Sequence, residues 1–126
     1  MTIFLTSCIG LIGERGNGVR IEETIQVDGF ERLEIGGEFI VKLTQAEGSE
    51  VLIETDENLL DYIDIRVRGN TLIVESERTL DSKEGIIVHI PVQGLKAIRC
   101  SGASDVSTSN PLQADRIDID LSGAGK

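Results

Sequence analysis

Apolar and polar residues alternate along most of the chain, the pattern of β-strands with one buried and one exposed face. The alternation is clearest near the middle, where Ile86, Val88, Ile90 and Val92 share one side of a strand. It predicts further strands near residues 19–27, 33–35, 39–43, 51–53, 63–67, 72–74, 98–100 and 117–121. Residues 57–62 form the only segment with a helical pattern. We therefore predict an all-β domain.

Turn signals separate these strands. Gly69-Asn70 lies between two alternating stretches and predicts a two-residue β-hairpin loop. Asp28-Gly29 predicts a turn, and residues 46–49 a loop. Residues 77–84 are charged and without periodicity, so we expect an exposed loop there.

A short motif recurs where strands end. Residues 98–104 (Ile-Arg-Cys-Ser-Gly-Ala-Ser) match residues 119–125 (Ile-Asp-Leu-Ser-Gly-Ala-Gly), and residues 33–39 are a weaker copy. Gly102 and Gly123 are 21 positions apart, and Gly37 precedes Gly102 by 65, close to three such periods. A fixed period indicates stacked repeats, and glycine permits the sharp corner between strands.

The repeat predicts a right-handed parallel β-helix-like solenoid with hairpin-rich coils at its N-terminal end and corners at Gly37, Gly102 and Gly123. The alternative is a set of unrelated hairpin turns that match by chance. Because the last motif reaches Lys126 without a cap, we expect further coils to follow.

Composition limits the classes of molecule that the chain is expected to bind. The 126 residues are 40% apolar, with 14 glycines and a net charge of −10. Such a surface repels nucleic-acid phosphates and anionic lipid head groups. The longest apolar run is too short to span a bilayer. Since no linker interrupts the later chain, residues 19–126 are predicted to form one domain.

The N-terminal segment, residues 1–18, has a different character. Leu5-Thr6-Ser7-Cys8 resembles the lipobox of bacterial lipoproteins, in which the cysteine thiol receives a diacylglycerol, and residues 9–13 would begin a flexible tether. Only seven residues precede Cys8 and none is Lys or Arg, so the signal is partial: the start lies upstream or the chain is a fragment. The alternative is an unmodified cysteine on a short apolar segment.

Candidate catalytic and metal-binding residues are scarce. His89, the only histidine, is expected on the exposed face of its strand, without the second ligand or nucleophile that zinc or acyl-transfer chemistry needs. Cys100 aligns with Ile35 and Leu121 in the motif and is expected to point inward as a small hydrophobe. We therefore predict no catalytic residue, no metal and no cofactor.

Acidic residues near the C-terminus provide the sharpest alternative. Asp118 and Asp120 share one face of a strand and lie near Asp115, and paired carboxylates can cleave polysaccharides. One strand supplies no convergent pocket, however, so a solvated acidic face is preferred. The single Asp105 beside a Ser-Gly corner does not repeat as calcium-binding repeats require. Sugar binding through stacked aromatic rings is also disfavoured, because there is no Trp and one Tyr.

Several motifs together resemble a known family. They are the Ser-Gly-Ala repeats, Val27-Asp28-Gly29-Phe30 before the strand at residues 33–35, and the segments 15–18, 56–63 and 67–72. They are similar to the head GIN domain of auto-transporter adhesins, over residues 15–126. The resemblance implies a β-helix-like fold and a bacterial envelope location, on the outer-membrane or periplasmic side. It brings no catalytic residues.

The hypothesis from sequence is thus a non-enzymatic, lipid-anchored envelope protein that acts as an adhesin or surface scaffold. Its partner would be an envelope protein or a glycan, and it would meet the membrane only through its anchor at Cys8. The alternative is a polysaccharide-active β-helix enzyme or a carbohydrate-binding module. Recurrent Asp, Arg or Lys on one face of further coils would favour the enzyme, and more Ser-Gly corners would favour the scaffold.

Overall fold

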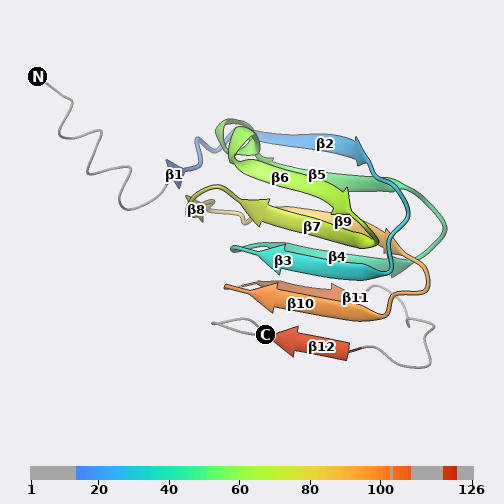
Figure 1. Cartoon of the computed structure of the whole chain (residues 1–126). Helices are drawn as coiled ribbons and strands as arrows, with labels where there is room; N and C mark the ends of the chain where they lie inside the picture. The colour runs from blue at the N-terminus through green and yellow to red at the C-terminus, as the bar shows by residue number, and fades with distance from the viewer. Residues whose placement is uncertain (1–13, 103, 109–117, 122–126) are drawn as a thin grey trace, which may run out of the picture.

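The computed structural model of the chain describes residues 14–102, 104–108 and 118–121 (Figure 1). Within them the chain forms β-strands and one short 3-10 helix, η1. The elements are β1 (Glu14–Arg15), β2 (Arg20–Gln26), β3 (Arg32–Gly36), β4 (Ile40–Gln45), β5 (Glu50–Asp56), η1 (Glu57–Tyr62), β6 (Ile63–Arg68), β7 (Thr71–Ser76), β8 (Leu80–Asp81), β9 (Ile87–Val92), β10 (Ala97–Ser101), β11 (Asp105–Thr108) and β12 (Asp118–Leu121).

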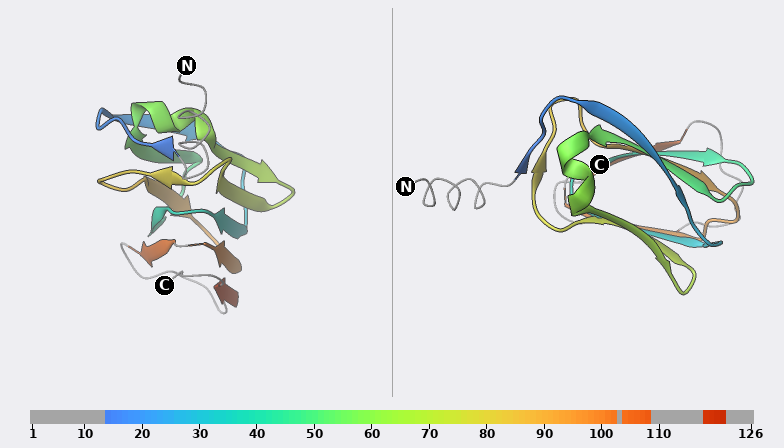
Figure 2. Two further views of the ribbon diagram at one scale, coloured as in Figure 1. Left: turned by 90° about the vertical axis from the view of Figure 1, so that its left-hand side faces the viewer. Right: turned by 90° about the horizontal axis from the view of Figure 1, so that it is seen from above.

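Two five-stranded sheets face each other across the core. The front sheet has the order β12-β10-β3-β7-β6, and the back sheet has the order β11-β4-β9-β5-β2. In Figure 1 the front sheet lies in front of the back sheet, and Figure 2 shows η1 across one end of the gap between them. A separate parallel pair, β1 and β8, lies beside that end.

Distant parts of the sequence form neighbouring strands. In the front sheet β7, β3, β10 and β12 are mutually parallel, and in the back sheet β9, β4 and β11 are parallel. Strand β3 pairs directly with β10, so that Leu33 lies beside Ile98 and Ile35 beside Cys100. The strands β5 and β6 run antiparallel to their neighbours, which makes both sheets mixed.

The all-β prediction is therefore confirmed, whereas the parallel solenoid is not. The strands do not stack in sequence order, and Gly37 and Gly102 lie on adjacent strand ends rather than three coils apart. The local reason is the Gly69-Asn70 loop, where Gly69 has a φ of +65°. A two-residue loop joins antiparallel strands only, because a parallel connection needs a dozen or more residues. The chain therefore reverses between β6 and β7.

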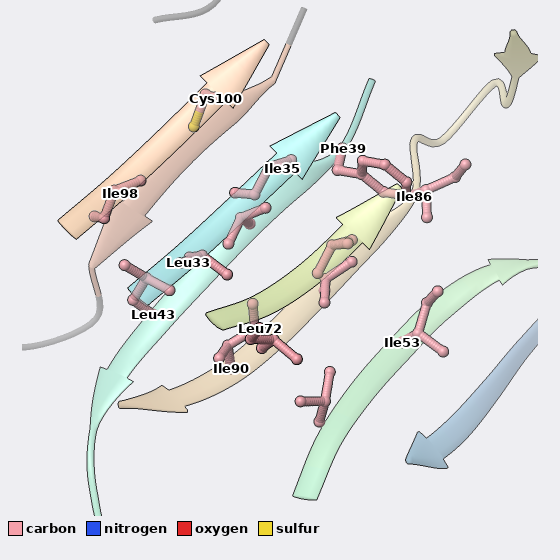
Figure 3. Close-up of a cluster of buried hydrophobic side chains, with 14 of the residues drawn as sticks. Leu33, Ile35, Phe39, Leu43, Ile53, Leu72, Ile86, Ile90, Ile98 and Cys100 are labelled. Atoms are coloured by element: carbon pink, nitrogen blue, oxygen red, sulfur yellow. The ribbon is translucent and has the colours of Figure 1, made fainter. Parts of the chain in front are cut away.

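Alternation along each strand builds the core. The inward residues of the two sheets are almost entirely aliphatic, and Figure 3 shows them meeting between the sheets. Fully burying one Val, Leu or Ile side chain contributes roughly 1.5–3 kcal/mol, so this layer dominates stability. The buried apolar residues are Leu33, Ile35, Phe39, Val41, Leu43, Val51, Ile53, Leu59, Leu72, Val74, Leu80, Ile86, Val88, Ile90, Val92, Leu95, Ile98 and Cys100.

The segments around the sheets match the predictions unevenly. The helical prediction for residues 57–62 is confirmed by η1, whose Leu59 is fully buried. The predicted exposed loop at residues 77–84 is partly wrong, because Leu80 is buried and belongs to β8, which pairs with β1. A single apolar residue among charged ones shows no periodicity, so the pattern could not identify it.

Candidate binding surface

Two of the three predicted corner glycines stack on each other. Gly37 follows β3 with a φ of +131°, and Gly102 follows β10 with a φ of +89°. The amide of Gly37 donates to the carbonyl of Ser101 (3.1 Å), and the Ser104 hydroxyl donates to the carbonyl of Gly37 (2.6 Å). Ser104, two residues after Gly102, thus links the corner at Gly102 to the corner at Gly37. Gly123 and Cys8 lie outside the described residues.

Cys100 lies in the core, as predicted. Its side chain points between the sheets beside Ile35 and Ile98 (Figure 3), and it is 1% exposed. Burial raises the pKa of the thiol, because an apolar environment disfavours the thiolate. A buried, protonated thiol is a packing group rather than a nucleophile.

Cys100→Ser is expected to lower the free energy of unfolding by about 1–3 kcal/mol, because it transfers a hydroxyl into aliphatic surroundings. Cys100→Ala should cost less. Urea unfolding of both variants would measure the difference. Thiol labelling of the folded Cys8→Ala chain checks the burial: modification of Cys100 at the rate of an unfolded peptide at neutral pH would contradict it.

A buried polar cluster at one end of the sandwich centres on Asp56, which is 2% exposed. Its carboxylate accepts hydrogen bonds from Arg20 (2.9 Å), the Ser82 hydroxyl (2.7 Å) and the amide of Gly18 (2.9 Å). A Cβ at Gly16 would overlap the same carboxylate. The cluster therefore fastens residues 16–20 to β5 and to the segment after β8.

The electrostatics of this cluster favour an ionised Asp56. Burial alone would raise the pKa of its carboxyl, but the hydrogen bonds from Ser82, Gly18 and Arg20, with the Arg20 charge, together lower it. Asp56 was not identified as a key residue from the sequence. The available signal was its place at the end of an alternating run, next to the inward-facing Thr55 and before a helical turn.

The outer face of the back sheet carries His89. Its ring Nε2 lies 2.5 Å from a carboxylate oxygen of Glu54 on β5, and both side chains are partly exposed. Within the described residues, no group of three or more His, Cys, Asp or Glu side chains is placed to hold a metal ion. The His89–Glu54 pair links two strands at the surface.

A shallow hollow of about 500 Å³ adjoins this pair. Its lining includes Leu52, Pro91 and the loop over residues 46–49. Pairing of β5 with β9 extends to Leu52 and His89 but not to Pro91, which has no N–H to donate. The two strands therefore separate there and leave the hollow open to solvent.

The outer face of the front sheet is a ladder of charged side chains. Asp118 and Asp120 are exposed on this face, as predicted, while Asp115 lies outside the described residues. Asp120 lies 3.7 Å from Arg99, and Arg99 is beside Glu34 on β3. Opposite charges on neighbouring strands stabilise the sheet. Glu34, Asp118 and Asp120 line one hollow of about 310 Å³, together with Arg32 and Arg99.

No helix in the described part of the chain has the length and apolar character needed to cross a bilayer.

The comparisons with known proteins agree on the fold. The family model described as "Putative auto-transporter adhesin, head GIN domain" matches residues 29–126. Solved structures that resemble the chain include a "putative adhesin" from Parabacteroides merdae (26% identity, TM-score 0.73, 85% of this chain and 45% of that chain). A "putative adhesin" from Bacteroides fragilis has 23% identity and a TM-score of 0.80 over 90% of this chain and 54% of that chain.

A third solved structure has a different name. The "Putative lipid binding protein" from Parabacteroides distasonis has 20% identity and a TM-score of 0.73, over 85% of this chain and 48% of that chain. The chain thus spans about half the length of these relatives. No curated protein matches the chain.

Proposed function

We propose that this chain, which belongs to the "Putative auto-transporter adhesin, head GIN domain" family, is a non-enzymatic binding domain of the bacterial cell envelope that holds a macromolecular partner on its exposed sheet faces. The observation that supports this most is the form of those faces. Each is a regular, solvent-exposed surface of paired polar side chains, such as Arg99 with Asp120 in front and His89 with Glu54 behind.

Such faces suit a macromolecule better than a small substrate. Small-molecule sites are concave and bury most of their ligand, whereas the hollow beside His89 is shallow and open. The polysaccharide-active alternative needs one carboxyl group to act as an acid and a second as a base or nucleophile at the same bond. Asp118 and Asp120 line one hollow, but Asp120 is paired there with Arg99. Lipid binding, the name of one relative, gains no support from hollows that are open to water.

The proposal is tested by measuring whether the folded chain is retained on immobilised envelope molecules. Beads coated with the folded chain are expected to be held on at least one member of a panel of immobilised envelope polysaccharides and surface proteins, without release of soluble sugar. Beads coated with the urea-unfolded chain are the control. Turnover of a panel polysaccharide, or equal retention of the unfolded control, would contradict the proposal.

Envelope location through a lipid anchor is part of the proposal and rests on Leu5-Thr6-Ser7-Cys8. Expressed from its full-length gene in a Gram-negative host fed labelled palmitate, the protein is expected to incorporate label. Cys8→Ala should abolish incorporation, because the thiol receives the lipid, while Cys100→Ala should leave it unchanged. Equal labelling of the wild type and Cys8→Ala would exclude this anchor.

A further inference from the structure

Strand β6 forms one edge of the front sheet and pairs only with β7 among the described strands. The two-residue loop after Arg68 makes Arg68 and Thr71 a hydrogen-bonded pair, so alternate residues of β6 bond to β7. The amide of Glu77 donates to the carbonyl of Tyr62 (2.8 Å), which agrees with even-numbered residues of this segment bonding toward β7. The N–H and C=O groups of Ile65 therefore point away from β7.

The edge of β6 has neither a proline nor an interruption in its pairing with β7, two of the features that commonly block strand addition at protein edges. It does carry charged side chains, Asp64 and Arg66, so the register of an added strand decides whether these charges repel or attract it. A hollow of about 500 Å³ lies between Ile65–Val67 and the segment 26–29. Ile65 and Val67 face the core side but remain partly exposed. Figure 2 shows the yellow-green β6–β7 hairpin projecting from the sandwich.

The charges on β6 are self-complementary. Asp64 and Arg66 point to the outer face, and Arg66 is held by ion pairs to Asp64 and to Glu75 on β7. If a second β6 runs antiparallel with Ile65 at the two-fold axis, each Asp64 lies opposite the partner's Arg66. The four side chains then alternate in sign, and opposite charges across strands are favourable. A two-fold axis at Arg66 would instead place the two Arg66 side chains opposite each other.

We infer that two copies of this chain associate edge to edge through β6, with Ile65 at the two-fold axis, and join their front sheets into one continuous sheet. The outward N–H and C=O groups of Ile65 supply the central hydrogen bonds. The half-exposed side chains of Ile63 and Val67 pack against each other across the axis. This isologous contact would present two copies of each binding face in one assembly.

The test measures molar mass by light scattering on the Cys8→Ala chain at increasing concentration in about 0.15 M salt, which screens the net charge of −10 beyond about 8 Å. The chain with wild-type β6 is expected to have a molar mass of twice 13.7 kDa, the mass of one chain. Asp64→Arg should weaken dimerisation at least tenfold, because four arginines would meet. Its fold should persist, since position 64 lies opposite Glu75. Asp64→Arg with Arg66→Asp should restore the dimer.

The matched control is Asp120→Arg, the same charge change on β12 at the other edge of the sheet. It should leave the dimer unchanged. A monomeric mass for the wild type at all concentrations, failure of the charge exchange to restore the dimer, or an equal effect of Asp120→Arg would overturn the inference.

Cross-linking fixes the register independently of stability. Residues 64 and 66 of the two copies form a non-hydrogen-bonded pair, with Cα atoms about 4.5 Å apart, within reach of a disulfide. Mixing Asp64→Cys and Arg66→Cys chains under oxidation should give a mixed disulfide dimer faster than either chain alone. Equal rates for the mixture and for each chain alone would contradict this register.

Discussion

Replacing Asp56 with alanine is expected to lower the free energy of unfolding by about 3 kcal/mol, the lower end of the cost of breaking a buried ion pair. The carboxylate is buried and accepts from Arg20, Ser82 and Gly18, all of which would lose this acceptor together. Arg20 would keep only its bonds to the Ser82 hydroxyl and the Glu54 carbonyl. The lower end applies because the Arg20 side chain is 23% exposed and can reach water.

The matched control is Asp81→Ala. Asp81 also pairs with an arginine, Arg15, at 3.7 Å, but both side chains are mostly exposed. An exposed pair contributes about 0–1 kcal/mol. Urea unfolding midpoints of the two variants measure the contrast, and a loss for Asp56→Ala no larger than that for Asp81→Ala would refute the role of the cluster.

The same cluster predicts a pH dependence with a definite sign. The pKa of Asp56 is lowered on folding from its ordinary value of 3.8, so the ionised form stabilises the fold above that pH. This contribution is lost as the pH falls from 3.8 through the folded-state pKa. The stability difference between wild type and Asp56→Asn should therefore be constant near neutrality and shrink below pH 3.8. A difference that grows in acid would have the wrong sign.

Gly102→Ala is the second large expected effect, a loss of about 2 kcal/mol or more in unfolding free energy. Two costs combine at this position. The φ of +89° disfavours any side chain, and an added Cβ would lie 3.1 Å from the carbonyl oxygen and 3.2 Å from the nitrogen of Gly37. Because these are backbone atoms of the stacked corner, they cannot move aside as a flexible side chain could.

Gly94→Ala separates the two costs. Gly94 also has a positive φ, +70°, but no atom lies within 4 Å of the place that an added Cβ would occupy. It should lose only the conformational term, about 1–2 kcal/mol. Equal midpoints for Gly94→Ala and Gly102→Ala in urea unfolding would show that the corners are not in close contact.

The alternating pattern predicted most of the strands and the inward side of each, as the burial of Val88, Ile90 and Cys100 illustrates. It could not predict which strands are neighbours. Alternation fixes the face on which a side chain lies, but pairing depends on the path of the chain, and every aliphatic strand here is an acceptable neighbour for every other. The shared motif did indicate that β3 and β10 are equivalent. Their spacing of 65 residues predicts a separation of three coils, which is wrong because the chain returns to β3 after passing through β4 to β9.

The surfaces were predicted less completely than the core. The outward position of His89 and of Asp120 followed from parity, but their side-chain partners Glu54 and Arg99 lie on other strands and depend on the pairing. The Asp56 cluster was missed for the same reason, because Arg20 and Ser82 are 36 and 26 residues away in sequence. The edge position of β6 required the complete strand order.

The front binding face depends on one claim, that β3 and β10 are direct neighbours. Spin labels at Glu34→Cys and Arg99→Cys in the Cys8→Ala chain measure this by electron paramagnetic resonance, since the two residues are paired on the outer face. Adjacent strands are about 4.8 Å apart, so strong dipolar broadening is expected. Strands three coils apart would be separated by about 14 Å. A spectrum with only the weak broadening of that longer separation would contradict the strand order described here.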